Sequence, residues 1–489
     1  MKIVRVFYCL IFCHVHCLVY LCSSIWNRNT TMKNYISQTF LFTSFVVTLL
    51  MLLHFLPTTT LAGYELREVD ILSDVRNIKS KKVLASEKNI EGQDYLVPDS
   101  VNVELVDTCK TGIVCIKDYA DSFNRGMKPF YDALHNRKRL NRPVRIAYFG
   151  DSFIEADILT GDLRSKLQSL YGGCGVGFVP VTSTTYGFRP TVKHSFQGWS
   201  SHFQTDKTDF DRSKQGIAGS YFIPSANAFV ELRGQNKYGL HLDTCEVVNI
   251  YYTSSEEVEL ESVVNKNKLA SHRSKGDKYM NSIQVEDRIG SVRWTVKNAE
   301  DAVFYGVAMD GKQGISLDNF ALRSTTGALL KTIPNQTLTE FGKVRPYDLI
   351  ILQYGLNIAT KKGTNYDYYT KSMLATIDHL KACFPNAGFL LISVGARDYK
   401  TPDGEYHTMP GVINLIDDQE ELAAKCGIAF WNMYEAMGGD GSIAKLVHSK
   451  PSKANRDYTH INFRGGKHMA ELLYETLIYG KEQYDARKK

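Results

Sequence analysis

The feature that most constrains the fold is an alternation of strand and helix patterns, broken in the middle by a long run of strands. Val144–Phe149 is a short apolar run of the kind found in buried parallel strands. Apolar residues from Ile154 to Leu170 then recur at helical spacing, which predicts a helix packed on that strand. Strand and helix patterns alternate again from Tyr347 to Tyr479. We therefore expect a three-layer α/β/α domain built on a parallel sheet.

The interruption runs from Thr191 to about Asp310 and has almost no helical periodicity. It contains the strand-like runs AFVELRG, EVVNIYYTS, EEVELESVV and SVRWTV, with polar turns such as NKNK between them. This pattern predicts an all-β sandwich inserted into the α/β domain. The expected segments are a leader at 1–62 and an N-terminal segment at 63–140. The first part of the α/β domain follows at 141–190, the insert at 191–310 and the second part of the α/β domain at 311–489.

The first 62 residues differ from the rest of the chain. They contain no Asp or Glu and hold two apolar stretches, Ile3–Leu21 and Phe40–Leu56. Met32 and Lys33 precede the second stretch and Thr60-Leu61-Ala62 follows it, which is the pattern of a secretory signal cleaved before Gly63. Translation starting at Met32 fits this pattern. An uncleaved membrane anchor is the alternative. We expect an exported protein, periplasmic or on the cell surface, with membrane attachment if the leader stays.

Charge and cysteine usage exclude some partners. Four of the 58 Lys and Arg residues, and none of the 52 Asp and Glu residues, lie in the leader, so the rest of the chain is close to neutral. A neutral chain gives no reason to expect nucleic acid as a partner. Six of the ten cysteines follow the leader without any C-x-x-C spacing, so we expect no metal site built on cysteine. Cys109 and Cys115 are close enough to pair in an oxidising compartment.

The first strand of the α/β domain ends in Gly150-Asp151-Ser152. A serine at the carboxyl end of a parallel strand, at the start of the next helix, lies where open α/β sheets bind ligands. Backbone N–H groups there can stabilise an oxyanion. The alternative interpretation is structural, because Ser152 with Glu155 three residues later forms a capping box.

A nucleophilic serine needs a base and a group that orients the base. Asp457 and His460 lie three residues apart before the last predicted helix, a spacing that lets the carboxylate reach the imidazole. Asn357 follows the strand Leu349–Tyr354, where its side-chain N–H can donate to an oxyanion. Each residue also has a structural alternative, as a turn residue, a loop histidine or a helix cap. Their shared position at one edge of a sheet favours the catalytic interpretation.

Together, these segments resemble the SGNH/GDSL hydrolase superfamily. Gly150-Asp151-Ser152, Gly355-Leu356-Asn357 and Asp457-x-x-His460 look like its blocks I, III and V, and the second oxyanion donor would be Gly327, with Ser324 as the alternative. The run GDSFIEADILTGDLRSKLQSLYGGCGVGFVP is similar to the branch with bacterial peptidoglycan O-acetylesterases, in which a carbohydrate-binding-like β-sandwich follows block I. Some relatives read Gly-Asp-Ser-His, whereas Phe153 follows the serine here.

The resemblance implies an esterase without cofactor or metal, in which Ser152 attacks, His460 and Asp457 activate it, and Ser152, Gly327 and Asn357 supply the oxyanion hole. The implied substrate is an acetylated glycan such as peptidoglycan. An O-acetyltransferase with the same triad and a glycan-binding protein with an idle triad are the alternatives. Trp294 is expected in the core of the insert and Trp199 in a loop-like setting. The glycan, the acyl chain length and the oligomeric state stay open.

Overall fold

The computed structural model describes residues 40–46, 60–61, 64–65, 109–120, 126–206 and 208–488. Met32 and the predicted cleavage site at Ala62 and Gly63 lie outside the described residues. Within the leader region the structure has a helix over residues 40–46 and an antiparallel pair, β1 (Thr60–Leu61) with β2 (Tyr64–Glu65). The chain divides into two compact units, Met1–Ser100 and Val101–Lys489. In the part that the structure describes, no helix is both long and apolar enough to cross a bilayer.

A six-stranded sheet in the order β14-β4-β15-β16-β19-β3 forms the centre of the α/β part. Five strands run parallel, and β3 pairs antiparallel at the edge. These strands are β14 (Ile315–Ala321), β4 (Val144–Gly150), β15 (Leu349–Gln353), β16 (Gly388–Ile392), β19 (Ala429–Trp431) and β3 (Lys117–Asp118). All of β4, β15 and β16 is buried, which explains their apolar sequences. In chain order the parallel strands run 2-1-3-4-5, so the direction of winding changes between β4 and β15.

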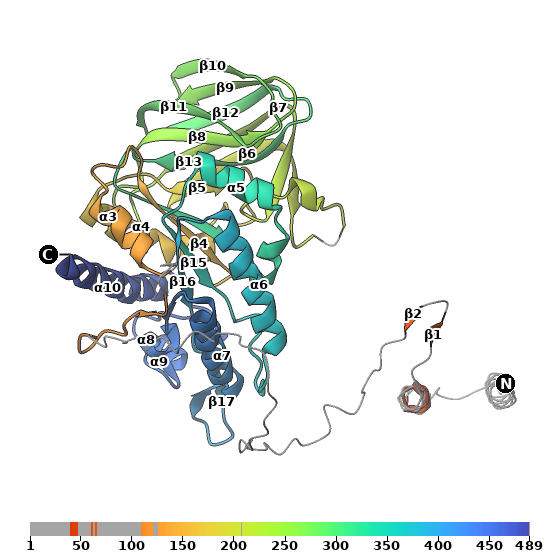
Figure 1. The fold of residues 1–489 in the computed structure, drawn as a ribbon, viewed down its shortest axis with the longest axis vertical. Helices are drawn as coiled ribbons and strands as arrows, with labels where there is room; N and C mark the ends of the chain where they lie inside the picture. The colour runs from red at the N-terminus through yellow and green to blue at the C-terminus, as the bar shows by residue number, and fades with distance from the viewer. Residues whose placement is uncertain are drawn as a thin grey trace, which may run out of the picture. The chain divides into compact units, whose positions relative to one another are not determined.

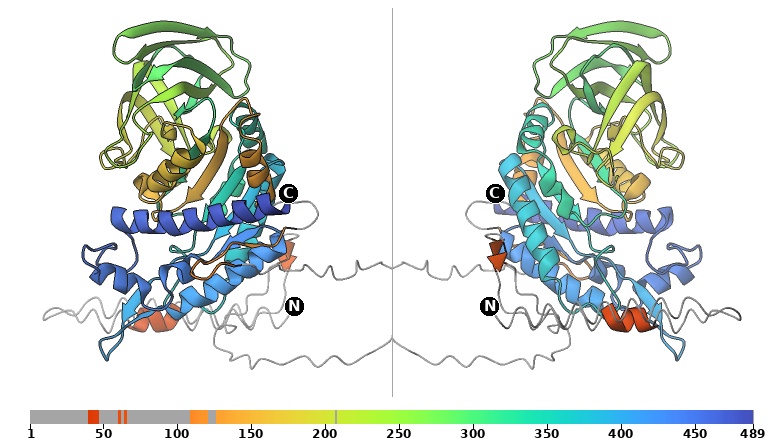
Figure 2. Two further views of the ribbon diagram at one scale, coloured as in Figure 1. Left: turned by 90° about the vertical axis from the view of Figure 1, so that its left-hand side faces the viewer. Right: turned by 90° about the vertical axis from the view of Figure 1, so that its right-hand side faces the viewer.

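Helices cover both faces of this sheet. One face carries α3 (Lys128–His135), α4 (Thr160–Tyr171) and α10 (Phe463–Arg487), and the other carries α5 (Asn335–Val344), α6 (Asp367–Cys383) and α7 (Pro410–Cys426) (Figure 1). The two opposite views of Figure 2 bring each set to the front in turn. Two shorter helices, α8 (Met433–Met437) and α9 (Ser442–His448), precede α10. The expected mixed α/β fold is thereby confirmed.

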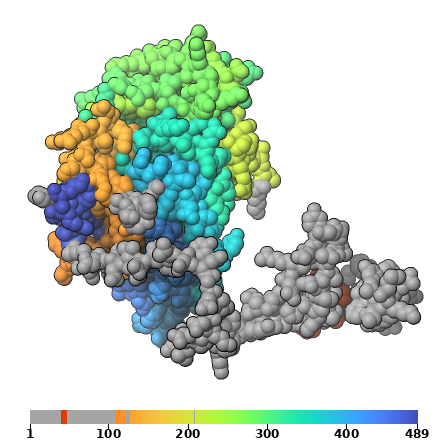
Figure 3. All heavy atoms as spheres, viewed as in Figure 1, coloured from red at the N-terminus to blue at the C-terminus, as the bar shows by residue number. Residues whose placement is uncertain are grey.

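A nine-stranded antiparallel sheet is formed by the middle of the chain. Its order is β10-β9-β12-β7-β13-β8-β11, with β6 paired to β7 and β5 to β13. The strands are β5 (Gly177–Pro180), β6 (Val192–Phe203), β7 (Ser220–Gly234), β8 (Cys245–Thr253), β9 (Val258–Val264), β10 (Lys268–Ser274), β11 (Asn281–Ile289), β12 (Ser291–Asn298) and β13 (Val303–Asp310). On the face shown in Figure 3, its atoms adjoin those of the α5 and α6 region.

This sheet has its own apolar core. Trp294 is buried in it, as expected. Trp199 is half-buried, packs edge-on against Phe304 and donates its indole N–H to the carbonyl oxygen of Phe229. β5 belongs to residues 141–190, which we expected in the α/β domain, yet it pairs with β13. β5 also contacts the parallel sheet, because the backbone N–H of Phe178 donates to Asp318 of β14.

The segment at residues 63–140 contributes to the α/β part. β3 adds the edge strand beside β19, and α3 packs near α10. Cys109 and Cys115 form a disulfide, with Cα atoms 5.7 Å apart. The other cysteines after the leader, Cys174, Cys245, Cys383 and Cys426, are free.

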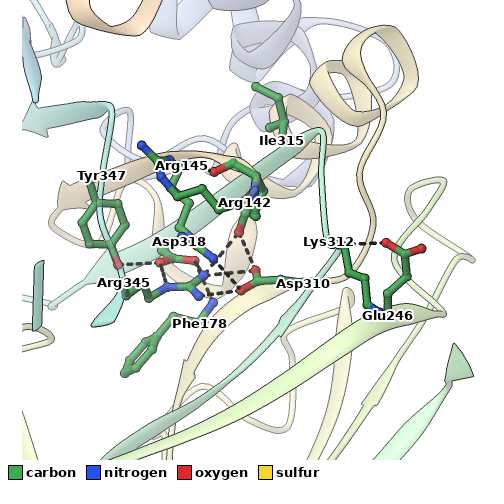
Figure 4. A network of polar contacts seen from close by, with 12 residues as sticks. Arg142, Arg145, Phe178, Glu246, Asp310, Lys312, Ile315, Asp318, Arg345 and Tyr347 are labelled. Carbon is green, nitrogen blue, oxygen red and sulfur yellow. Dashed lines mark hydrogen bonds and ion pairs between the residues drawn. The ribbon is translucent and has the colours of Figure 1, made fainter. Parts of the chain in front are cut away.

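One buried arginine connects the two sheets (Figure 4). Arg345, after α5, has no exposed side-chain surface and donates to Asp310 of β13, at 2.5 and 3.1 Å, and to Asp318 of β14, at 2.6 and 2.7 Å. Asp318 also accepts from the hydroxyl of Tyr347 and from the backbone N–H of Phe178 in β5. Burial raises the pKa of Asp310, but the adjacent guanidinium outweighs it and holds that pKa well below its ordinary value.

We expect Arg345→Leu to destabilise the protein severely. It leaves Asp318 without its cation and Asp310 with only Arg145, at 3.9 Å, and breaking such a cluster typically costs about 3–5 kcal/mol. The measurement is the urea midpoint of unfolding. Arg273→Ala is the matched control, because Arg273 pairs with Glu259 at the surface and should cost at most about 1 kcal/mol. Equal midpoints for the two variants would contradict a joining role for Arg345.

Candidate active site

Ser152 lies in a turn two residues after the end of β4. The expected helix after β4 forms, but its expected start near Ile154 is wrong, because α4 begins only at Thr160 and a short 3-10 turn, Glu155–Asp157, precedes it. Ala156 and Asp157 have φ angles of 52° and 61°, a left-handed conformation that prevents α4 from extending back to Ser152. The capping-box alternative is also wrong, since Glu155 pairs with Arg323 instead, at 2.6 Å. Ser152 is therefore not at the N-terminus of a helix.

A buried carboxylate holds this turn in place. Asp157 accepts from the guanidinium groups of Arg164 at 3.2 Å and of Arg189 at 2.8 Å. It also accepts from three uncharged side chains, those of Thr160, Thr191 and Asn319. Burial raises the pKa of Asp157, but the two arginines overcome it and leave that pKa far below the ordinary value. The left-handed backbone is thus stabilised by a charge that stays ionised.

Asn319, in β14, ties the same turn to the sheet. Its side-chain amide donates to the carbonyl oxygen of Ile154 at 2.7 Å. Sequence reasoning missed Asp157, Arg164, Arg189 and Asn319. No local pattern points to them, because the partners of Asp157 lie 7, 32 and 162 residues away along the chain.

His460 lies beside Ser152 and Asp457. Ser152 Oγ and His460 Nε2 are 3.1 Å apart, and His460 Nδ1 and Asp457 Oδ2 are 2.8 Å apart. Asn462 begins α10 as a side-chain cap, accepting from the N–H groups of Arg464 and Gly465. The structure thus brings Ser152 to His460 and Asp457, from which the sequence separates it by more than 300 positions.

The Asp457 carboxylate is oriented by its own loop. Its Oδ1 atom accepts from the backbone N–H groups of Thr459 and His460, both at 3.0 Å, which leaves Oδ2 for the imidazole. Partial burial raises the pKa of Asp457, but the hydrogen bonds lower it by more. The net result is a pKa below the ordinary value. Asp457 is therefore ionised at neutral pH and able to hold His460 through Nδ1.

Asn357 follows β15, as predicted, and reaches across to the Ser152 turn. Its side-chain nitrogen donates to the carbonyl oxygen of Thr325 at 2.8 Å and to Asp151 Oδ2 at 3.2 Å. Gly355 precedes it with a φ of 142°, and a Cβ there would lie 2.6 Å from Val394. The chain can take this sharp path only with glycine at position 355.

The loop after β14 contains both candidates for the second oxyanion donor. Leu322 donates its backbone N–H to the carbonyl oxygen of Gly150, which brings this loop beside Ser152. Ser324 has a left-handed φ of 62° and is exposed. Gly327 is buried, and a Cβ there would lie 2.6 Å from the ring of Tyr354. Gly327 therefore faces packed side chains, while Ser324 lies at the open surface.

Asp151, between Gly150 and Ser152, is buried. Its carboxylate accepts from the N–H of Phe153 at 3.0 Å as well as from Asn357. Burial raises the pKa of Asp151 to about 6, with only partial compensation from these hydrogen bonds and from His460. The group that orients Asn357 thus changes its charge within the range where many enzymes work.

Comparisons with known proteins bear on the fold. No protein-family model matches the chain, and no curated protein sequence matches it. A solved structure titled "Peptidoglycan O-acetylesterase in action, 5 min" aligns with a TM-score of 0.61 and 18% identity, covering 75% of this chain and 99% of that one. The chain is similar in fold to a peptidoglycan O-acetylesterase. The expected resemblance to the SGNH hydrolases is confirmed at the level of the fold.

Two further solved structures align more loosely. One is a family two carbohydrate esterase from Clostridium thermocellum, with a TM-score of 0.25, 12% identity and coverage of 57% of this chain and 97% of that one. The other is an acetyl xylan esterase, with a TM-score of 0.24, 16% identity and coverage of 33% and 80%.

Asp151 should give stability a distinct pH dependence. The pKa of Asp151 is about 6 in the folded protein and near 3.8 when the group is exposed in the unfolded chain. Its stabilising contribution to the free energy of unfolding is therefore complete below pH 4 and is lost as the pH rises through 6. In Asp151→Asn this loss, on the order of 3 kcal/mol, should disappear. Urea midpoints of both proteins between pH 4 and 7 measure it. The substitution also shifts the urea midpoint by the same amount at every pH, so the slopes of midpoint against pH are compared. Parallel curves for the two proteins would refute the assignment of this pH dependence to Asp151.

Proposed function

We propose that this protein is a serine esterase of the SGNH type, with Ser152 as nucleophile, His460 as general base and Asp457 as the group that orients His460. The observation that carries the proposal is the continuous chain of contacts, 3.1 Å from Ser152 Oγ to His460 Nε2 and 2.8 Å from His460 Nδ1 to Asp457 Oδ2. The similarity in fold to a peptidoglycan O-acetylesterase supports the same assignment.

In the first step, Ser152 Oγ attacks the ester carbonyl carbon while its proton moves to His460 Nε2. The tetrahedral intermediate then collapses, the bond to the leaving oxygen breaks, and His460 returns the proton to the departing sugar hydroxyl. Asp457, ionised because of its low pKa, stabilises the imidazolium formed between these events. The acyl group remains on Ser152. Water then attacks the acyl carbon while His460 takes its proton, and as the bond to Ser152 Oγ breaks, His460 returns that proton to Oγ and the acid leaves.

The negative charge that develops on the carbonyl oxygen needs donors aimed at it. We assign this role to the backbone N–H of Ser152, the side chain of Asn357 and the loop that contains Ser324. In the absence of substrate, the side-chain nitrogen of Asn357 donates to two protein acceptors, the carbonyl oxygen of Thr325 and the carboxylate of Asp151. The oxyanion replaces Asp151, whose contact is the longer of the two. The buried setting of Gly327 favours Ser324 as the remaining donor.

Exposure of the site favours hydrolysis over acyl transfer. The side chains of His460 and Asp457 are 37% and 48% exposed, so water reaches the base freely. A transferase has to exclude water from its acyl-enzyme so that a sugar hydroxyl attacks instead.

We propose O-acetyl esters, or other short acyl esters, of peptidoglycan or another surface polysaccharide as the substrate. The support is the fold neighbour, whose title names peptidoglycan. The antiparallel sheet, which carries a separate apolar core, is proposed as an inserted β-sandwich of the carbohydrate-binding kind, approximately over residues 191–310. Its large β6–β7 pair extends toward the active edge, where Gln204 donates to the carbonyl oxygen of Leu329.

We further propose that the protein is exported to the periplasm or cell surface. The leader composition supports this, and so does the Cys109–Cys115 disulfide, because such bonds persist mainly in oxidising compartments. If the leader is cleaved before Gly63, the product is soluble; if it is not, the leader keeps the protein attached to the membrane. Mass spectrometry of the N-terminus of the protein recovered from cells distinguishes the two forms.

We expect the full-length protein to release acetate from O-acetylated peptidoglycan, and Ser152→Ala to lose this activity by roughly 10⁴-fold or more, because the acyl-serine cannot form. Ser169→Ala on α4, whose hydroxyl bonds the carbonyl oxygen of Ser165, is the control and should keep full activity. Acetate release that survives in Ser152→Ala would refute the nucleophile. Transfer of acetyl to an added glycan, with little free acetate, would establish the transferase instead.

Asn357→Ala should lower kcat by about 10²–10³-fold with little change in KM, since the lost donor acts mainly on the oxyanion. Kinetics on p-nitrophenyl acetate measure both constants. Asn298→Ala, at the end of β12 in the antiparallel sheet, is the matched control. A rise in KM at constant kcat would place Asn357 in ground-state binding instead.

A further inference from the structure

A small hairpin places aromatic side chains against the loop that carries Asp457 and His460. β17 (Asp398–Lys400) pairs antiparallel with β18 (Tyr406–Thr408). The N–H of Asp398 donates to the carbonyl oxygen of Tyr458 at 3.1 Å, and Tyr458 lies directly after Asp457 in the chain. The hairpin is thereby fixed beside the proposed catalytic histidine.

Tyr406 and Tyr458 form a stacked pair at this point. Their ring centroids are 4.6 Å apart with an interplanar angle of 23°, and their hydroxyl oxygens are 2.8 Å apart. His448 Nε2 lies 3.1 Å from the Tyr458 hydroxyl. Both tyrosines are only partly buried, so ring surface stays open to solvent.

The backbone of Tyr458 is strained. Its φ is 53°, a left-handed conformation that is rare for a bulky side chain. Strain of this kind concentrates at functional sites, because the surrounding structure must maintain it. Here the paired hydroxyl groups and the bond from Asp398 maintain it, and the result is a tyrosine pair within two residues of His460.

One lysine borders the pair, and a second lies against another tyrosine of the same hairpin. Lys400 Nζ lies 5.9 Å from the centroid of the Tyr406 ring, and Lys361 Nζ lies 4.2 Å from the centroid of the neighbouring Tyr399 ring. Neither lysine has a carboxylate partner among the residues for which the structure gives side chains. Their ammonium groups are therefore available as donors to the oxygen atoms of a ligand.

We propose that Tyr406 and Tyr458, with Lys400 beside them, form a subsite for a sugar ring of the glycan chain next to the acylated sugar. A pyranose has an apolar C–H face that packs on an aromatic ring and a rim of oxygen atoms that accept from hydroxyl and ammonium groups. Tyrosine offers both surfaces with little loss of conformational entropy. The inference rests on the proposed function, because a sugar ester bound at Ser152 must pass its neighbouring rings over surfaces close to His460.

The test compares two substrates of the full-length protein, O-acetylated peptidoglycan and p-nitrophenyl acetate, which has no glycan chain. Tyr406→Ala should lower kcat/KM on peptidoglycan by roughly tenfold relative to its own value on p-nitrophenyl acetate, mostly through KM. Tyr406→Phe keeps the ring and should retain most of the peptidoglycan activity. Tyr368→Ala on α6, where the side chain is 88% exposed, is the matched control and should change neither.

Equal losses on both substrates would overturn the subsite and make Tyr406 a positioning residue for the Asp457 loop. No loss on either would overturn it as well. If the unaltered protein hydrolyses neither ester, the proposed function fails, and the subsite is judged by binding of chitopentaose by isothermal titration calorimetry. Binding that is about tenfold weaker in Tyr406→Ala would still support the subsite, whereas equal or undetectable binding would refute it.

Discussion

The buried guanidinium of Arg345 is the constraint on which the arrangement of the two sheets depends. Its partners Asp310 and Asp318 belong to different sheets and are separated by a short connection in the chain. Three charged groups lose their water, and this is tolerable only because nearly every donor and acceptor is satisfied. The antiparallel sheet is therefore held against the α/β part. Its loops reach the active edge, where the amide of Gln204 bonds the segment that follows Gly327.

The strand order then determines which residues meet. Ser152 follows β4 and Asn357 follows β15, the two neighbours between which the winding changes direction, and crevices form at such points. His460 comes from near the other end of the chain, and a close contact of the helix that follows it brings it to Ser152. At the start of α10, a Cβ on Gly466 would lie 1.8 Å from the carbonyl oxygen of Ile158. Glycine there lets the helix touch the turn that carries Ser152, which sets the distance between serine and histidine.

The sequence was sufficient for four strands of the parallel sheet, β4, β15, β16 and β19, and for the residues after β4 and β15, but it missed β14. β4 and β15 are mostly apolar, and the polar residues after Gly150 and Gly355 therefore stand out, whereas the buried polar residues Ser316, Asp318 and Asn319 interrupt the apolar pattern of β14. The start of α4 could not be predicted, because helical spacing continues through Ile154 and Ile158 while distant partners of Asp157 force a left-handed turn. Gly327 and Ser324 could not be separated either. Their loop has no periodicity, and the difference lies in packing against Tyr354, from another strand end.

Three carboxylates near Ser152 illustrate how surroundings assign roles to one chemical group. Asp157 is buried between two arginines and stays ionised as a structural anchor. Asp151 is buried without a cation, so its pKa rises to about 6 and it orients Asn357 through hydrogen bonds. Asp457 is half-exposed, and backbone N–H groups together with the His460 side chain hold its pKa below the ordinary value. Only Asp457 has its charge directed at an imidazole, and a strong cation beside it would compete with the imidazolium that catalysis requires.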